Sequence, residues 1–85
     1  MRPVLIVHGG SGTISPELHA AARAGIREAA RVGREILLAG GTCEDAAVAA
    51  VCVLEDDPAF NAGRGACMNR DGQFELDAAI MRSRD

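Results

Sequence analysis

The chain of 85 residues contains no lysine, tryptophan or tyrosine, and only two phenylalanines. Its formal net charge is -3, and its arginines do not form the kind of cluster that releases counterions from a nucleic acid. The absence of lysine also excludes the P-loop of nucleotide-binding proteins, which requires a Gly-Lys-Ser/Thr sequence. The composition therefore argues against nucleic-acid partners and against a P-loop nucleotide site.

Long apolar runs and paired cysteines are also missing. The apolar run near the start has only about five residues, which is shorter than a signal peptide or a membrane span requires. We therefore expect a cytoplasmic protein with no membrane partner. The three cysteines, Cys43, Cys52 and Cys67, are odd in number and lack the C-x-x-C spacing. Neither a disulfide framework nor a zinc site is expected from them.

What remains is the composition of one small domain spanning residues 1–85, in which 48% of the residues are hydrophobic. Residues 3–7 predict a strand, because β-branched residues dominate and both faces are apolar, as in a strand covered on both sides. Two further strands are predicted over residues 66–70 and 73–81. Asp71-Gly72 between them is a strong hairpin signal.

A long helix is predicted after the first strand. Ser15 and Pro16 are an N-cap residue and the residue favoured at the first helical position, and Gly40-Gly41 ends the helix. Apolar residues recur inside it at spacings of three and four, which gives one stripe that faces a core. The stripe consists of Leu18, Ala22, Ile26, Ala29, Gly33, Ile36 and Leu37.

A second helix follows over about residues 43–55. Thr42 is its predicted N-cap, with Asp45 in the capping-box position. Acidic residues 55–57 stand at its C-terminus, where negative charge opposes the helix dipole. A cation held by the backbone of the next loop would compensate this charge, and a solvated acidic end is the alternative. The spacing does not match an EF-hand.

Two glycine-rich stretches are candidates for function. In "HGGSG", backbone N–H groups could face an anion, but the dinucleotide fingerprint lacks its third glycine. The oxyanion loop of esterases lacks its G-x-S-x-G partner here. A functional glycine loop and a plain tight turn therefore both stay open, and His8 is better explained as an anchor of the turn than as a base. In "FNAGRG", the glycines permit a backbone shape that side chains forbid. That loop either wraps something or lets something come close.

Three motifs together resemble one family: "VHGGSG", "LEDDPAFNAGRGA" and "DGQFELDAAIM" are similar to segments of the plant-type asparaginases, also called isoaspartyl peptidases. The resemblance runs in order through residues 1–81. These proteins are N-terminal-nucleophile hydrolases. The resemblance implies an α/β fold, in which this chain is a fragment of an αββα sandwich with a strand, two helices and a β-hairpin.

The resemblance also implies a reaction. In the family the precursor cleaves itself, and the threonine freed at the new N-terminus attacks the side-chain amide of L-asparagine or a β-aspartyl peptide bond. Thr13 and Thr42 do not follow a cleavage-type sequence, so we expect the nucleophile to lie beyond this truncated chain. The missing C-terminal part, or β subunit, would complete the enzyme, which we expect to be a homo-oligomer of αβ units. The 85 residues alone would be inactive. A non-catalytic remnant or assembly fragment is one alternative, and glycosylasparaginase is the other.

The site residues are assigned only from the resemblance to the family. Gly9, Gly10 and Gly12 match the family's glycine loop beside the nucleophile, and Asn61 matches an asparagine at the edge of the active-site pocket. No cofactor is implied for the chemistry, but a structural sodium ion is. Its predicted ligands are the main-chain carbonyls of Leu54, Glu55, Asp57, Phe60, Ala62 and Arg64. The resemblance stops at residue 81, where the family's Asp-Gly is replaced by Arg82-Ser83-Arg84-Asp85.

Overall fold

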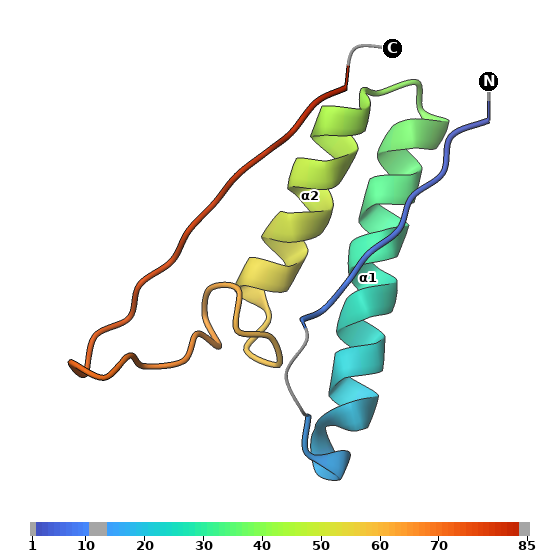
Figure 1. The fold of residues 1–85 in the computed structure, drawn as a ribbon. Coiled ribbons are helices and arrows are strands. Elements are labelled where there is room, and N and C mark those ends of the chain that lie inside the picture. The colour runs from blue at the N-terminus through green and yellow to red at the C-terminus, as the bar shows by residue number, and fades with distance from the viewer. Residues whose placement is uncertain (1, 11–13, 84–85) are drawn as a thin grey trace.

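The computed structural model describes residues 2–10 and 14–83. Its centre is a pair of antiparallel helices, α1 (His19–Leu38) and α2 (Cys43–Asp56), and a short 3-10 turn, η1 (Pro16–Leu18), leads into α1. An extended N-terminal segment runs along α1, and a longer extended segment passes from the end of α2 back along that helix (Figure 1). None of the described helices is long and apolar enough to cross a membrane.

The helix ends follow local signals in the sequence. Thr42 Oγ1 accepts a hydrogen bond from the Asp45 N–H at 3.0 Å, so the predicted cap of α2 is confirmed. The turn between the helices closes when the Gly41 N–H donates to the Ile36 carbonyl at 2.8 Å. Gly40 has a φ of +86°, a left-handed conformation that glycine adopts without strain. Ser15 stands at the predicted start, but its side chain makes no capping hydrogen bond.

Small residues let the two helices approach closely. Along α1 the buried positions are Ala22, Gly25, Ala29 and Gly33, which only partly match the predicted stripe, because Leu18 is 46% exposed. Across from them α2 buries Ala46, Ala50 and Leu54. A Cβ at Gly33 would lie 2.8 Å from Leu5 Cδ2 and 3.2 Å from the Ala46 carbonyl oxygen. At this point α1, α2 and the N-terminal segment meet without room for another methyl group.

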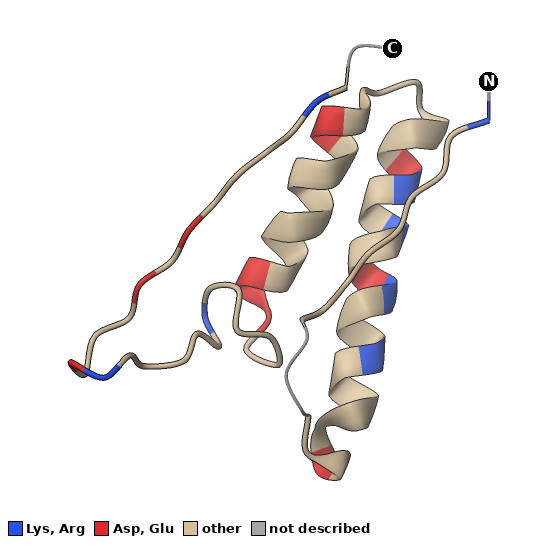
Figure 2. Cartoon of the chain, in the orientation of Figure 1, with Lys and Arg blue, Asp and Glu red and all other residues tan. Residues whose placement is uncertain are grey.

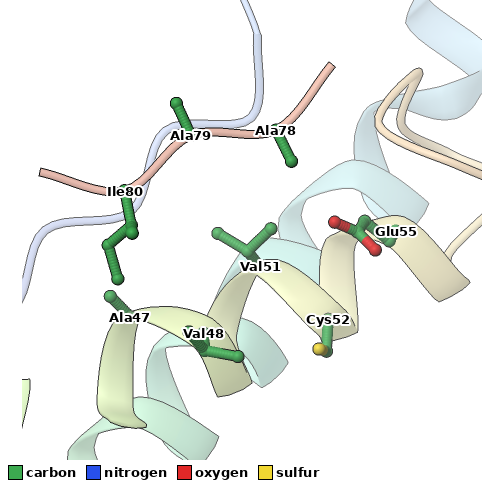
Figure 3. A pocket seen from close by; sticks show the side chains of 8 residues that line it. All are labelled: Ala47, Val48, Val51, Cys52, Glu55, Ala78, Ala79 and Ile80. Carbon is green, nitrogen blue, oxygen red and sulfur yellow. The ribbon is translucent and has the colours of Figure 1, made fainter. Parts of the chain in front are cut away.

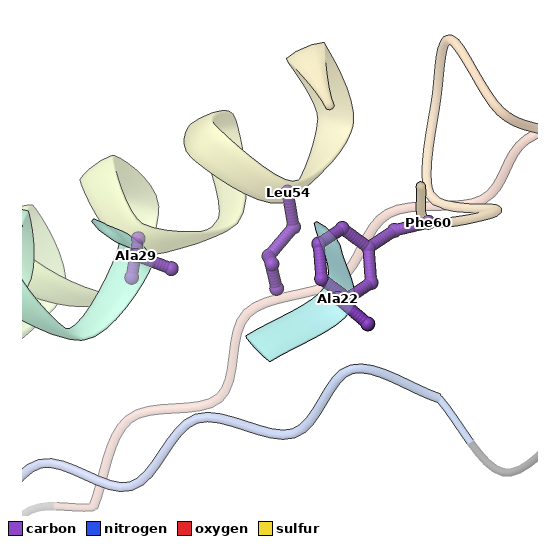
Figure 4. Packing of buried hydrophobic residues seen from close by; sticks show 5 residues of the cluster. Ala22, Ala29, Leu54 and Phe60 are labelled. Carbon is purple, nitrogen blue, oxygen red and sulfur yellow. The ribbon is translucent and has the colours of Figure 1, made fainter. Parts of the chain in front are cut away.

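The core cluster contains five buried residues, of which only two have large side chains (Figure 4). Leu54 from α2 and Phe60 from the following loop supply these, and the other three members are the alanines Ala22, Ala29 and Ala50. Val7 of the N-terminal segment packs against the cluster. Since most of the buried side chains are methyl groups, Leu54 and Phe60 carry a large share of the apolar area removed from water.

The predicted strands are not confirmed. Residues 3–7, 66–70 and 73–81 are extended, but no paired strand forms in the described part of the chain. The turn between the last two segments does form: the Asn69 N–H donates to the Gln73 carbonyl at 2.8 Å, and Gly72 has a φ of +75°. Pairing does not continue beyond it. A strand needs a neighbouring chain with free N–H and C=O groups, whereas the neighbours here are helices, whose backbone groups are already bonded.

Only one face of the N-terminal segment is covered. Leu5 and Val7 are half-buried against the helices, whereas Val4 is 80% exposed and Ile6 is 88% exposed. In the C-terminal segment every residue from 70 to 83 is exposed, including Leu76 at 59% and Ile80 at 62%. The prediction that residues 3–7 are apolar on both faces is therefore matched by packing on one face alone.

Candidate functional site

The glycine loop begins directly after the N-terminal segment. His8 Nδ1 accepts a hydrogen bond from the Gly10 N–H at 3.0 Å, and Gly10 has a φ of +115°. The imidazole therefore acts as the anchor of this turn, which is the role that the sequence favoured over that of a base. Gly12, the third glycine predicted for this loop, and Thr13 lie outside the described residues.

The second part of the site is the loop that follows α2. Asp57 Oδ1 accepts a hydrogen bond from the Ala59 N–H at 2.9 Å, and the Phe60 N–H donates to the Asp57 carbonyl at 3.1 Å. These two bonds make a tight turn that sends the Phe60 ring back under the helices, where only 4% of the residue is exposed (Figure 4). Asn61, the next residue, is exposed.

The two glycine-rich stretches meet, although about fifty residues of sequence separate them. A Cβ built on Gly10 would lie 3.8 Å from Asn61 Oδ1. Gly9, Gly10 and Asn61 line one pocket of about 290 Å³. Cys67 also lines this pocket, a position that the sequence did not indicate, because a lone cysteine carries no motif. Gly9 and Gly10 of the glycine loop and Asn61 of the predicted pocket edge are thus brought together.

The loop carrying Asn61 closes on itself through its backbone. The Arg64 N–H donates to the Glu55 carbonyl at 2.8 Å. A Cβ at Gly63 would lie 2.6 Å from that same oxygen, and a Cβ at Gly65 would overlap the carbonyl oxygens of Phe60 and Pro58. The main-chain oxygens of Phe60 and Pro58 therefore converge beside Gly65, in the space that a side chain at residue 65 would fill. Such a cradle fits a hard cation bound by backbone oxygens.

The six predicted carbonyl ligands differ in whether they already accept a backbone hydrogen bond. Two of them already accept a backbone hydrogen bond inside the loop, Glu55 from Arg64 and Asp57 from Phe60, and Leu54 accepts a longer one of 3.4 Å from Asp57. Each carbonyl keeps a second lone pair. The Phe60 carbonyl borders the cradle beside Gly65. Among the described residues, none donates a backbone hydrogen bond to the carbonyls of Ala62 and Arg64, which belong to exposed residues of this loop.

Side chains do not form a comparable metal site in the part of the chain that the structure describes. No group of three or more His, Cys, Asp or Glu side chains converges there. Asp57, one of the acids at the end of α2, already uses a carboxylate oxygen on the Ala59 N–H. Chelation of a divalent ion by residues 55–57 is therefore not supported, which leaves the backbone oxygens as the candidate ligands.

Helix α1 carries four arginines and two glutamates, and other charged residues lie on α2 and on the extended segments (Figure 2). Arg31 bonds Glu28 at 2.6 Å and 2.9 Å and Glu35 at 2.7 Å. The hydrogen bond from Arg31 lowers the pKa of Glu28, and the two carboxylates raise the pKa of Arg31. Two other arginines of α1, Arg23 and Arg27, line a groove of about 420 Å³ together with the glycine loop. Positive charge is therefore available beside Gly9 and Gly10.

A second groove lies between α2 and the C-terminal segment (Figure 3). Val48 and Val51 of α2 and Ile80 of the extended segment are among the apolar residues that line it, and its volume is about 400 Å³. Its polar members are Cys52 and Glu55, which do not converge with any other polar group of the groove. It offers apolar contact but no arrangement for chemistry, so we place the candidate site at the glycine loop and Asn61.

Known proteins are similar to this chain over nearly its whole length. The sequence model of the protein family described as asparaginase matches residues 1–85. The isoaspartyl peptidase/L-asparaginase of Bos taurus is 50% identical over 86 residues, which cover 100% of this chain and 28% of the bovine protein. The proteins of the same name from Danio rerio and Homo sapiens are 48% and 46% identical, over 99% and 100% of this chain. The chain thus spans about 28% of the bovine and human relatives and 27% of the zebrafish one.

Proposed function

Because the chain belongs to the asparaginase family, we propose that it forms the N-terminal part of an amidohydrolase that acts on L-asparagine and β-aspartyl peptides. The observation that carries this proposal is the meeting of Gly10 and Asn61 in one pocket. The names of the relatives, isoaspartyl peptidase/L-asparaginase, indicate the two substrate classes.

We assign the nucleophile to an N-terminal threonine, freed by self-cleavage, that is not among residues 1–85. Thr42 is unsuited to the role, because its hydroxyl accepts the hydrogen bond that caps α2. The 85 residues alone would then bind and position but not react. The proposed partner is the β subunit that carries the threonine, in a homo-oligomer of αβ units.

Gly9, Gly10 and Asn61 would border the reacting group. Glycine leaves the backbone accessible, and the asparagine amide can both donate and accept hydrogen bonds. Arg23 and Arg27 line the adjoining groove and would attract the carboxylate of an aspartyl substrate towards the glycine loop. These residues would orient the substrate, while the nucleophile and its base come from elsewhere in the enzyme.

The same proposal includes the αββα sandwich. In it, the extended residues 3–7 and 73–81 would pair with strands supplied by the rest of the enzyme, and a second sheet would cover Val4 and Ile6. The support is the exposure of these two side chains, because a large uncovered apolar face normally meets a partner. We also propose a cytoplasmic location, which is supported by three exposed, unbridged cysteines.

We propose in addition that the loop after α2 holds a structural sodium ion through the carbonyls of residues 54, 55, 57, 60, 62 and 64. The support is the backbone cradle beside Gly65 and the closure of the loop by Arg64 and Glu55. A bound cation would also offset the negative charge at the end of α2, where Glu55 and Asp56 are exposed.

A chimera tests the proposed activity. Residues 1–85 replace the matching segment of the Bos taurus relative, and self-cleavage is followed together with hydrolysis of L-asparagine, an isoaspartyl dipeptide and a glycosylated asparagine. We expect self-cleavage and hydrolysis of the first two substrates. In the same chimera, Asn61→Ala should reduce turnover but leave the melting temperature nearly unchanged, since the side chain is exposed.

A chimera that folds, cleaves itself and hydrolyses only the glycosylated substrate would assign the segment to a glycosylasparaginase. A folded chimera without any turnover would identify a non-catalytic remnant.

The sodium proposal is tested by thermal unfolding of the chimera in sodium chloride and in choline chloride. A bound ion raises the melting temperature by mass action, and Gly65→Ala should abolish that difference by placing a methyl group against the Phe60 and Pro58 carbonyls. Asp56→Ala removes an exposed carboxylate and keeps the carbonyls, so it should retain the difference. Loss of the sodium effect in Asp56→Ala, and its survival in Gly65→Ala, would show that side chains bind the ion.

A further inference from the structure

We propose that Phe60 is a positioning residue of the site: its ring, seated between Gly9 and Gly25, holds Asn61 against Gly10. The inference rests on the proposed function, because it assigns to a buried aromatic side chain the task of placing an active-site amide. The ring itself would touch neither substrate nor nucleophile.

On one side the ring lies against the glycine loop. A Cβ built on Gly9 would be 2.9 Å from Phe60 Cε1 and 2.9 Å from Ile26 Cδ1. Real Cβ atoms do not approach carbon this closely, so residue 9 must lack a side chain for the ring to lie where it does. The ring thus supports the backbone immediately before Gly10.

On the other side the ring lies against α1. Gly25 is buried in the middle of this helix, and a Cβ there would overlap Phe60 Cε2 and Asp57 Oδ2 and lie 3.0 Å from Phe60 Cζ. Glycine destabilises a helix interior relative to alanine. Its presence at residue 25 is explained by the space that the ring and the Asp57 carboxylate occupy.

Asn61 depends on this anchor because its own side chain is exposed and therefore not held by packing. Its Cα is one peptide bond from Phe60, so a displaced ring displaces the Asn61 amide relative to Gly10. Asp57 reinforces the arrangement, since its Oδ1 accepts the Ala59 N–H while its Oδ2 borders Gly25. Gly9, Gly25 and Phe60 therefore fit together, and we call these three residues the socket.

The test compares two identical substitutions in the same helix of the chimera. Gly25→Ala places a methyl group inside the socket, whereas Gly33→Ala places one against Leu5 and Ala46, away from Asn61. Both should lower the melting temperature. Only Gly25→Ala should also lower kcat, by about tenfold or more, with a smaller change in KM, since misplacing a positioned group by about 1 Å can cost about 100-fold.

A second experiment compensates for the volume added at residue 25 by making residue 60 smaller. In the double variant Gly25→Ala/Phe60→Leu, the smaller side chain relieves the overlap with the ring but not that with Asp57 Oδ2, so kcat should recover part of the loss seen in Gly25→Ala alone. Equal kcat in Gly25→Ala and Gly33→Ala, or a double variant no better than the product of the single changes, would reduce Phe60 to an ordinary core residue.

A readout that does not depend on activity separates this inference from the proposed function. In the 85-residue chain, Gly25→Ala should shift the NMR signals of the Gly10 backbone amide and the Asn61 side-chain amide, and Gly33→Ala should leave both in place. Shifts of this pattern with an inactive unsubstituted chimera would refute the proposed function and keep the socket. Unshifted signals in Gly25→Ala with an active chimera would refute the socket and keep the function.

Discussion

The helical hairpin, residues 16–56, and the extended segments on either side of it were all predicted from sequence as regular structure, but only the hairpin forms it among the described residues. The difference lies in where backbone hydrogen bonds are made. Each helix bonds N–H and C=O groups within its own segment, whereas a strand must find them on another chain segment. A helix can therefore form in isolation from the rest of a sheet, and a strand cannot.

Side-chain burial separates the two regions in the same way. The facing surfaces of α1 and α2 bury alanines, glycines and Leu54, while Val4, Ile6 and Leu76 of the extended segments remain more than half exposed. Apolar periodicity marks a face that must be covered, but it does not supply the cover. The extended segments carry the pattern of buried strands without the neighbours that would bury them.

The largest expected effect is a difference in the free energy of unfolding between two Leu→Ala substitutions, one in each region. Leu54→Ala removes one of the two large side chains of the core, and such changes cost about 2–5 kcal/mol. Leu76→Ala, at a residue that is 59% exposed, should change the free energy of unfolding by less than about 0.5 kcal/mol. Urea denaturation followed by far-ultraviolet circular dichroism measures both. Similar losses for the two variants would mean that the C-terminal segment is packed in solution.

A smaller effect is expected at the start of α2, where a local signal decides the structure. Thr42→Ala removes the acceptor for the Asp45 N–H and should cost about 1 kcal/mol. Thr42→Ser keeps the hydroxyl and is the matched control, with nearly unchanged stability. The same denaturation experiment applies. If serine were as destabilising as alanine, the contribution of residue 42 would come from its methyl group rather than from the cap.

The smallest effect concerns the exposed ion pairs on α1. Arg31 lowers the pKa of Glu28 in the folded chain, so this pair stabilises the fold above the unfolded pKa of Glu28, and the contribution disappears as the pH falls through the folded pKa. Arg31→Gln should raise the pKa of Glu28 towards its ordinary value, as followed by NMR titration, with little change in stability at neutral pH. Arg34→Gln serves as the control. An unchanged Glu28 pKa in Arg31→Gln would show that the pair is not populated in solution.

Local signals explain which parts of the fold were predictable. The Thr42 cap and the Gly40-Gly41 stop set the ends of the helices, and α2 reaches Asp56, one residue past the predicted end. The turn at Asp71-Gly72 also formed as predicted, because Asn69 closes it with bonds inside five residues. Strand pairing was not predictable in this way, since it depends on segments distant in sequence.

The candidate site was predicted residue by residue only through family resemblance. The sequence alone left open whether "HGGSG" was functional, and nothing in it indicated that Asn61 lies beside Gly10. Gly25 was missed altogether, although a glycine inside a helical pattern is a signal that another group approaches closely. The approaching groups, Phe60 and Asp57, lie more than thirty residues further along the chain.

The sequence by itself determined the two helices, the Thr42 cap of α2 and the tight turns, because these depend on hydrogen bonds and backbone conformations within a few residues. Tertiary structure alone decided that Phe60 fills the space left by Gly9 and Gly25 and that Asn61 comes to lie beside Gly10. That outcome depends on steric fit between segments far apart in the chain. An apolar side chain can be covered or left in water, and only the arrangement of the packed elements distinguishes Leu5 and Val7 from Val4 and Ile6.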